Sequence, residues 1–220
     1  MSYIVGWMTY FLNSLFQFAS MIGLPYWGVA IILLTVIIKM VLYPLQLKQM
    51  RSMRKMMDLQ PRIKELQQRH KDQPQKGNAE MMEMYKKNNV NPAAGCLPML
   101  VQLPVFWALY RAFLNFDYGD GSSAYFIWFS LADPHDPLYL LPILAAGTTY
   151  LQTKLSSPNA GTDPTQRIML YAMPLMFAWI TATVPPGLGL YWVVMNLVTI
   201  LQLLFINRIL TKEKESAGKA

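Results

Sequence analysis

The chain has 220 residues, of which 54% are hydrophobic and 14% are charged, and its formal net charge is +7. Ordinary soluble domains are about 25% charged, so this composition predicts an integral membrane protein. A single cysteine, Cys96, excludes an intramolecular disulfide, and two distant histidines, His70 and His135, argue against a histidine-based metal centre. We therefore expect no enzyme activity, no cofactor and no metal.

Residues 1–23 form the first predicted element, an uncharged amphipathic helix lying flat on the outer leaflet. Polar residues recur every three or four positions between Ser2 and Ser20, while apolar residues such as Leu12 and Leu15 occupy the other face. A sixth membrane span is the alternative, but six spans would no longer agree with the distribution of Lys and Arg along the chain.

Five apolar stretches follow, each close to the roughly 20 residues that a helix needs to cross a bilayer. We assign the spans to residues 24–47, 93–115, 138–155, 168–184 and 187–210. The remaining segments are a cytoplasmic helical hairpin (48–92), an extracytoplasmic loop (116–137), a cytoplasmic loop (156–167) and a basic cytoplasmic tail (211–220). The predicted fold is an all-α polytopic membrane protein with five transmembrane helices.

The basic residues predict the orientation of these spans. Of 19 lysines and arginines, 11 lie in the 48–92 segment, whereas residues 1–38 and the 116–137 loop contain none. Loops rich in Lys and Arg remain cytoplasmic. We therefore expect the N-terminus outside and the C-terminus in the cytoplasm.

The 48–92 segment is predicted to form two helices, about 48–71 and 77–88, separated by Asp72-Gln73-Pro74 and Gly77. Its many methionines either pack the two helices together or receive varied apolar partners. Its basic surface contacts anionic lipid headgroups or a ribosome, and headgroups are the simpler expectation.

Lys39 is the one charged residue in the apolar run from Tyr26 to Pro44. A charge at such depth costs about 2.5–3.5 kcal/mol on insertion scales, and no Asp or Glu occurs in another apolar segment to pair with it. Lys39 therefore either extends its amine to the membrane surface or lines a hydrated cavity.

Polar residues of other spans are expected at a similar depth. Lys39 follows Trp27 by about 12 residues, a rise of roughly 18 Å, and the neighbouring polar positions are Thr35, Gln102, Gln152, Asn196 and Gln202. Each amide could instead make an interhelical hydrogen bond worth about 0.6 kcal/mol. Their shared depth around an unpaired charge favours a hydrated pocket open to the cytoplasm and capped outside by aromatic residues.

Several segments in a fixed order also resemble the YidC/Oxa-type membrane protein insertases, in the short form found in Gram-positive bacteria. The likeness extends from Leu24 to Leu210 and rests on the following stretches: Tyr43-Pro44-Leu45, Met56-Met57-Asp58-Leu59-Gln60-Pro61, Val90-Asn91-Pro92, Gly95-Cys96-Leu97-Pro98, Gln102-Leu103-Pro104, Thr162-Asp163-Pro164, and Gly187-Leu188-Gly189-Leu190-Tyr191-Trp192 with Asn196-Leu197.

The resemblance implies a positively charged groove, open to the cytoplasm and lipid, that receives polar parts of an incoming chain. It places Lys39 at the family's groove arginine, Gln152 at its third-span glutamine and Trp192 at its fifth-span aromatic residue. Lysine keeps the charge but lacks the bidentate fork of arginine. The predicted groove residues are Lys39, Thr35, Gln102, Gln152, Tyr191, Trp192, Asn196 and Gln202.

The polar residues around Lys39 and the family resemblance lead to the same expected function, which is insertion and folding of nascent membrane proteins in the bacterial plasma membrane. The expected partners are nascent membrane proteins, with a Sec-type translocon, the ribosome and anionic lipids as further candidates. Two alternatives remain: a small-anion transporter that binds its substrate through Lys39, and a structural scaffold whose basic hairpin binds headgroups.

Overall fold

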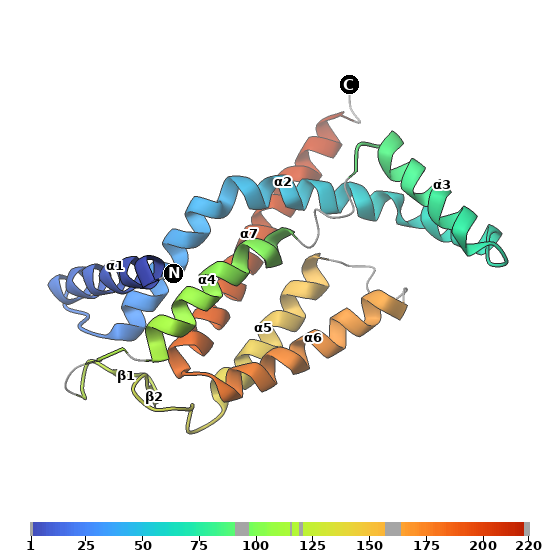
Figure 1. Cartoon of the computed structure of the whole chain (residues 1–220). Helices are drawn as coiled ribbons and strands as arrows, with labels where there is room; N and C mark the ends of the chain where they lie inside the picture. Colours follow the sequence, from blue (N-terminus) through green and yellow to red (C-terminus); the bar gives the residue numbers. More distant parts are fainter. Residues whose placement is uncertain (1, 91–96, 115, 119–120, 157–163, 218–220) are drawn as a thin grey trace. The chain divides into compact units, whose positions relative to one another are not determined.

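The computed structural model describes residues 2–90, 97–114, 116–118, 121–156 and 164–217 (Figure 1). Its elements are α1 (Ser2–Met21), α2 (Trp27–Arg69), α3 (Pro74–Lys87), α4 (Leu97–Leu114), β1 (Tyr125–Phe126), β2 (Phe129–Ser130), α5 (Leu140–Ser156), α6 (Pro164–Thr183) and α7 (Pro186–Ala217). The predicted all-helical class is confirmed, apart from the short β1–β2 hairpin. Parts of the predicted segments 48–92, 93–115, 116–137, 156–167 and 211–220, including Cys96, lie outside the described residues.

The chain divides into two compact units, residues 42–103 and a larger unit made of residues 1–41 and 104–220. Two described helices, α2 and α7, are long and apolar enough to cross a membrane, and Arg167–Thr183 is a shorter apolar helix. The number of spans therefore stays a prediction.

Helix α2 is longer than any element expected from the sequence. It continues through Pro44 and Pro61 to Arg69, so the predicted first span and the first hairpin helix are one helix. Gly77 was expected in the break between the hairpin helices, but it lies inside α3 and is buried there. A Cβ at Gly77 would approach the His70 Cβ to 3.1 Å, so the residue permits close packing of α3 rather than ending a helix.

The smaller unit has its own apolar core between α2 and α3. Leu59, Ile63 and Val90 are buried, and Met56, Met81, Met84 and Tyr85 pack against them. His70 Nε2, directly after the end of α2, lies 3.0 Å from Glu80 Oε2 of α3 and adds a polar contact within the hairpin. Several methionines of the segment thus serve packing within the hairpin, whereas Met82 is exposed.

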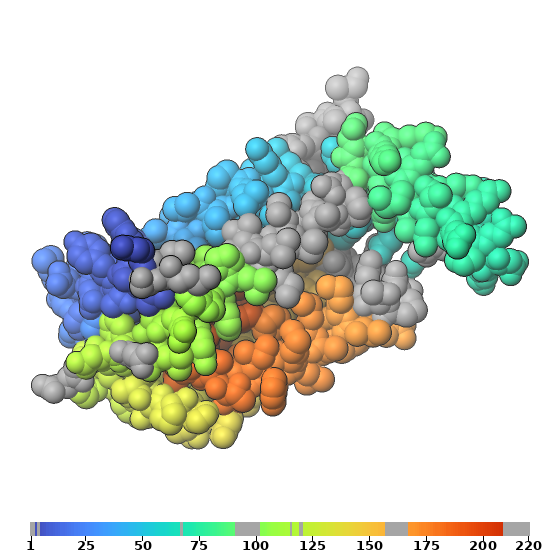
Figure 2. Space-filling model, viewed as in Figure 1, coloured from blue at the N-terminus to red at the C-terminus, as the bar shows by residue number. Residues whose placement is uncertain are grey.

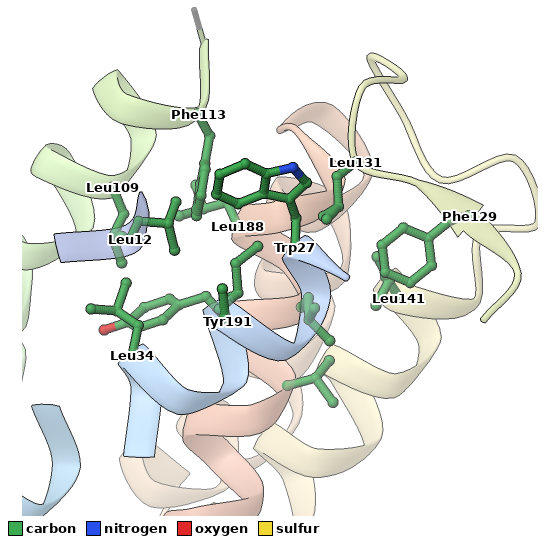
Figure 3. Packing of buried hydrophobic residues seen from close by; sticks show 14 of the residues in the cluster. Leu12, Trp27, Leu34, Leu109, Phe113, Phe129, Leu131, Leu141, Leu188 and Tyr191 are labelled. Carbon is green, nitrogen blue, oxygen red and sulfur yellow. The ribbon is translucent and has the colours of Figure 1, made fainter. Parts of the chain in front are cut away.

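Residues from α1, α2, α4, the β hairpin, α5 and α7 converge in the core of the larger unit (Figure 3). We call this cluster the aromatic core, because several aromatic rings meet within it: Trp27 stacks on Phe16 with ring centroids 3.9 Å apart and meets Phe116 edge-on at 4.7 Å. The Trp27 indole N–H donates to the Tyr118 carbonyl oxygen at 2.9 Å. This core joins the N-terminal ends of α2, α5 and α7 to the loop between α4 and α5.

Close backbone approach explains one glycine in this core. A Cβ at Gly28 would lie 2.3 Å from the Phe126 ring, inside any allowed contact distance. Gly28 therefore lets the β1–β2 hairpin pack directly on the first turn of α2.

The loop before α5 is held by a buried carboxylate. Asp136 Oδ2 accepts from the Leu141 N–H at 2.7 Å, and Oδ1 accepts from the Leu138 N–H and the Trp128 indole N–H, both at 3.2 Å. The bond to Leu141 satisfies an N–H in the first turn of α5, where a helix has no internal acceptors, and the other two hold the loop before it.

Helix α1 packs one face on the aromatic core of the larger unit. Leu12 and Ala19 are buried, and Met8, Leu15 and Phe16 contact the same cluster. Its outward face carries Tyr3, Trp7 and Tyr10, each more than two-thirds exposed. The predicted apolar face thus contacts protein, and the placement of α1 on the outer leaflet stays a prediction.

Helix α5 packs against both α6 and α7. The α6 surface forms part of the face in view in Figure 2, where it is orange. Large apolar residues recur on α6 every three or four positions and are exposed: Ile168, Tyr171, Leu175 and Trp179. This spacing gives one continuous apolar stripe along the helix.

The Tyr118 hydroxyl is buried without a hydrogen-bond partner among the described residues, and its burial raises the pKa of Tyr118 above the usual range. An unpaired buried hydroxyl costs about 1–3 kcal/mol. We therefore expect Tyr118→Phe to leave the free energy of unfolding unchanged or to raise it by about 1 kcal/mol. Unfolding in detergent measures this change. A clear loss of stability would show that the hydroxyl has a partner.

Candidate functional site

Lys39 lies inside the larger unit and is only 6% exposed. Its Nζ donates a hydrogen bond of 2.6 Å to Thr199 Oγ1 on α7. The Thr199 hydroxyl in turn donates to the Met195 carbonyl oxygen at 2.7 Å. Its one proton is therefore used within α7, so the oxygen can serve only as an acceptor toward Lys39.

Lys39 and Thr199 can pair because they lie at similar distances from the starts of their helices. Lys39 lies about 12 residues after Trp27, near the start of α2, and Thr199 lies about 12 residues after Gly187, near the start of α7. Both helices begin at the aromatic core, so the two residues share a rise of roughly 18 Å.

The ammonium has hydrogen-bonding capacity left over. A lysine ammonium has three N–H donors, and within the described part of the chain Thr199 is its one hydrogen-bond partner. No carboxylate of the described residues forms a salt bridge with it. Lys39 thus presents a buried positive charge that is held by a neutral acceptor and can bind further acceptors.

Asn196 joins α7 to α5 one turn closer to the aromatic core. Its Nδ2 donates to Thr148 Oγ1 at 3.0 Å and to Thr149 Oγ1 at 2.9 Å. Asn196 is 2% exposed and Thr149 is 7% exposed, so the bond between them is shielded from solvent, whereas the bond to Thr148 is only partly buried. We call these three residues the Asn196 clasp.

Two glutamines of the site have buried carbonyl oxygens without a partner among the described residues, Gln152 Oε1 on α5 and Gln202 Oε1 on α7. Gln202 follows Thr199 by three residues and Gln152 follows Thr149 by three, so each lies about one turn beyond a residue already described. Buried polar atoms normally have a protein or water partner. These two oxygens therefore mark positions where water or another chain can donate a hydrogen bond.

The other predicted site residues serve packing in this structure. Thr35 is fully buried, and its hydroxyl donates to the Ile31 carbonyl oxygen at 2.7 Å within α2. Tyr191 is 1% exposed and belongs to the aromatic core (Figure 3). Trp192 packs edge-on against Phe106, with ring centroids 5.7 Å apart, and against Phe177 at 4.0 Å.

Gln102 is the one predicted site residue that belongs to the smaller unit. It lies in α4 and is partly buried. Within the larger unit the structure thus brings Lys39 into contact with Thr199, and Asn196 into contact with Thr148 and Thr149.

Sequence reasoning missed Thr148, Thr149 and Thr199. Threonine is common in apolar helices and usually bonds a carbonyl oxygen of its own helix, as Thr199 and Thr148 also do here. A usable signal was the three-residue spacing of Asn196, Thr199 and Gln202, which places them on adjoining faces of α7.

The Asn196 clasp should make a measurable contribution to the free energy of unfolding, because it joins α7 to α5. We expect Asn196→Leu to lower the free energy of unfolding by about 1 kcal/mol, since interhelical hydrogen bonds in membranes average about 0.6 kcal/mol each. Thermal unfolding in detergent measures the loss. In a Thr148→Val/Thr149→Val background the same substitution should cost little further stability, and a full additional loss would contradict the clasp.

Comparisons with known proteins identify relatives along most of the chain. A family model described as "60Kd inner membrane protein" matches residues 17–214. The chain is 40% identical over 215 residues to "Membrane protein insertase YidC" of Wolinella succinogenes and 39% identical over 217 residues to the protein of that name from Campylobacter jejuni. Each alignment covers 97% of this chain, and 40% and 41% of those relatives.

A solved structure shows a similar fold. "Active YidC insertase crystal structure with the first transmembrane domain resolved" matches with a TM-score of 0.73 and 27% sequence identity, over 90% of this chain and 45% of that one. This chain therefore spans about two fifths of the length of the curated relatives and slightly less than half of the solved chain. The predicted likeness to the short, Gram-positive form of the YidC/Oxa-type insertases stays a prediction.

Proposed function

Because the chain belongs to the 60Kd inner membrane protein family, we propose that it is a membrane protein insertase, which inserts nascent membrane proteins and helps them to fold. The observation that carries the proposal is the Lys39 ammonium, buried among apolar helices, bonded to one neutral hydroxyl and without a carboxylate partner among the described residues. Such a charge is costly in a membrane, so its presence indicates a function.

The proposed site is a hydrated, positively charged groove open to the cytoplasm. Lys39, Thr35, Gln152, Asn196 and Gln202 of the larger unit provide its polar residues, and Tyr191 and Trp192 close it toward the extracytoplasmic side. The unpartnered oxygens of Gln152 and Gln202 support this assignment, since water or a client backbone N–H would satisfy them. The aromatic packing around Trp27 and Tyr191 supports a dry outer end.

In this mechanism a client's hydrophobic segment moves along lipid-facing surfaces of α5 and α7. Leu151 of α5 and Leu197 and Leu201 of α7 are exposed apolar residues that suit such contact. The client's short polar flank enters the groove, where Lys39 attracts acidic groups. Hydration there lowers the cost of bringing polar groups into the membrane, and no covalent bond is made or broken.

The proposal extends to topology and partners. Five spans place the N-terminus outside and the C-terminus in the cytoplasm of a bacterium, and the basic 48–92 segment contacts anionic headgroups. A Sec-type translocon and the ribosome are further proposed partners. The comparisons do not favour the small-anion transporter as an alternative.

Photocrosslinking to a stalled nascent chain tests the function. A photoreactive amino acid at Gln152 or Leu201 should crosslink to the hydrophobic segment of a membrane-protein nascent chain. The same group at Trp179, exposed on α6, is the matched control and should crosslink much less. Equal crosslinking at all three positions would contradict a defined client path, and anion flux in sealed vesicles would revive the transporter.

A further inference from the structure

We propose that Thr199 is the positioning residue for Lys39: its hydroxyl holds the ammonium inside the groove, where it selects clients with acidic flanks. The inference rests on the proposed insertase function and deepens it, because it names a residue that sets the location of the attracting charge. Thr199 makes no contact with a reacting group, so its action on clients is indirect.

The first argument is the direction in which the Lys39 side chain extends. A lysine in a membrane helix can lower its free energy by extending its amine to the aqueous surface. Here the amine instead crosses to α7, where Lys39 Nζ and Thr199 Oγ1 are 2.6 Å apart, and the residue is 6% exposed. A short bond from a charged donor is stronger than one between neutral groups, and it opposes extension to the surface.

The second argument concerns how Thr199 itself is fixed. Its hydroxyl proton is committed to the Met195 carbonyl oxygen at 2.7 Å, which directs the oxygen lone pairs away from α7. Three residues earlier, Asn196 binds α7 to Thr148 and Thr149 of α5. The acceptor for Lys39 is therefore held by its own helix, and that helix is tied to a neighbour one turn away.

The third argument is that a neutral acceptor suits client selection. An acidic partner at position 199 would neutralise Lys39 and compete with client carboxylates. A hydroxyl leaves the net charge in place and occupies one of three donors, so two N–H groups remain for a client. Thr199 thus fixes the ammonium without cancelling the attraction that the proposed mechanism needs.

Removal of this hydroxyl at constant shape is the direct test. In proteoliposomes containing the full chain, Thr199→Val should lower insertion of a client with an acidic translocated tail by roughly three- to fivefold, as expected for the net loss of one hydrogen bond while the charge itself remains. Insertion of the same client with a neutral tail should change less than about twofold. Thr199→Ser keeps the hydroxyl and should restore most of the acidic-tail preference.

A double substitution separates positioning from a merely structural role. With Lys39→Met in place, Thr199→Val should have no further effect on either client, because no ammonium remains to be positioned. Equal losses for acidic and neutral tails, or an undiminished loss in the Lys39→Met background, would overturn the inference. If Lys39→Met itself changes nothing, the charge-based groove fails; if Lys39→Met acts but Thr199→Val does not, only the role of Thr199 fails.

Discussion

Reversing the charge at position 39 should produce the largest functional defect. Lys39→Glu should slow insertion of clients with acidic translocated tails at least about fivefold, because attraction over a few ångströms in a partly hydrated site is worth about 1–4 kcal/mol and becomes repulsion. Lys39→Ala should give an intermediate loss. Rates of insertion into proteoliposomes measure the effect.

Lys39→Arg is the matched control for charge. Arginine keeps the positive charge and adds donors in a planar fork, so the Arg form should retain activity on acidic tails. Clients with neutral tails should be less sensitive to all three substitutions. Equal activity of the Glu and Lys forms on acidic-tailed clients would contradict the electrostatic part of the mechanism.

Loss of the Trp27 side chain should cause the largest defect in stability. Trp27 is 6% exposed, stacks on Phe16 of α1, and bonds the Tyr118 carbonyl oxygen through its indole. Its backbone N–H also donates to the Ser123 carbonyl oxygen at 3.0 Å. Trp27→Ala removes the ring from a packed core, and we expect a loss of about 3–5 kcal/mol, measured by thermal unfolding in detergent.

A second tryptophan provides the control for this experiment. Trp179 on α6 is 70% exposed, so Trp179→Ala removes the same side chain without opening a cavity and should cost less than about 1 kcal/mol. Trp27→Phe should fall between the two, since it keeps an aromatic ring but loses the indole hydrogen bond. Similar losses for Trp27→Ala and Trp179→Ala would show that the aromatic core does not stabilise the larger unit.

The sequence was informative where a residue type conflicts with its surroundings. Lys39 stands out because a charge in an apolar run has no local explanation, and the structure buries it against α7. Asn196, Gln152 and Gln202 stand out for the same reason, and each has a buried polar atom that the structure relates to a neighbouring helix or leaves without a partner.

The sequence was uninformative where tertiary packing overrides local preference. Gly77 and Pro44 usually mark helix ends, yet one lies inside α3 and the other inside α2. At Gly77 the helix continues, and the lack of a side chain leaves room for His70 to pack against α3. The contact between Lys39 and Thr199 spans 160 positions, so the spacing of Thr199 with Asn196 and Gln202 could mark a polar face of α7 but could not show that Lys39 reaches it.

Hydration at the depth of Lys39 is the central claim, and thiol labelling measures it directly. In a Cys96→Ser background, single cysteines at Gln152 and Gln202 are exposed to a membrane-impermeant maleimide from the cytoplasmic side. Cysteines at Ile143 of α5 and Leu190 of α7, nearer the aromatic core, are the matched controls on the same helices. A thiol reacts as the thiolate, which requires water. We expect labelling at Gln152 and Gln202 and none at Ile143 and Leu190; silence at Gln152 and Gln202 would contradict the groove.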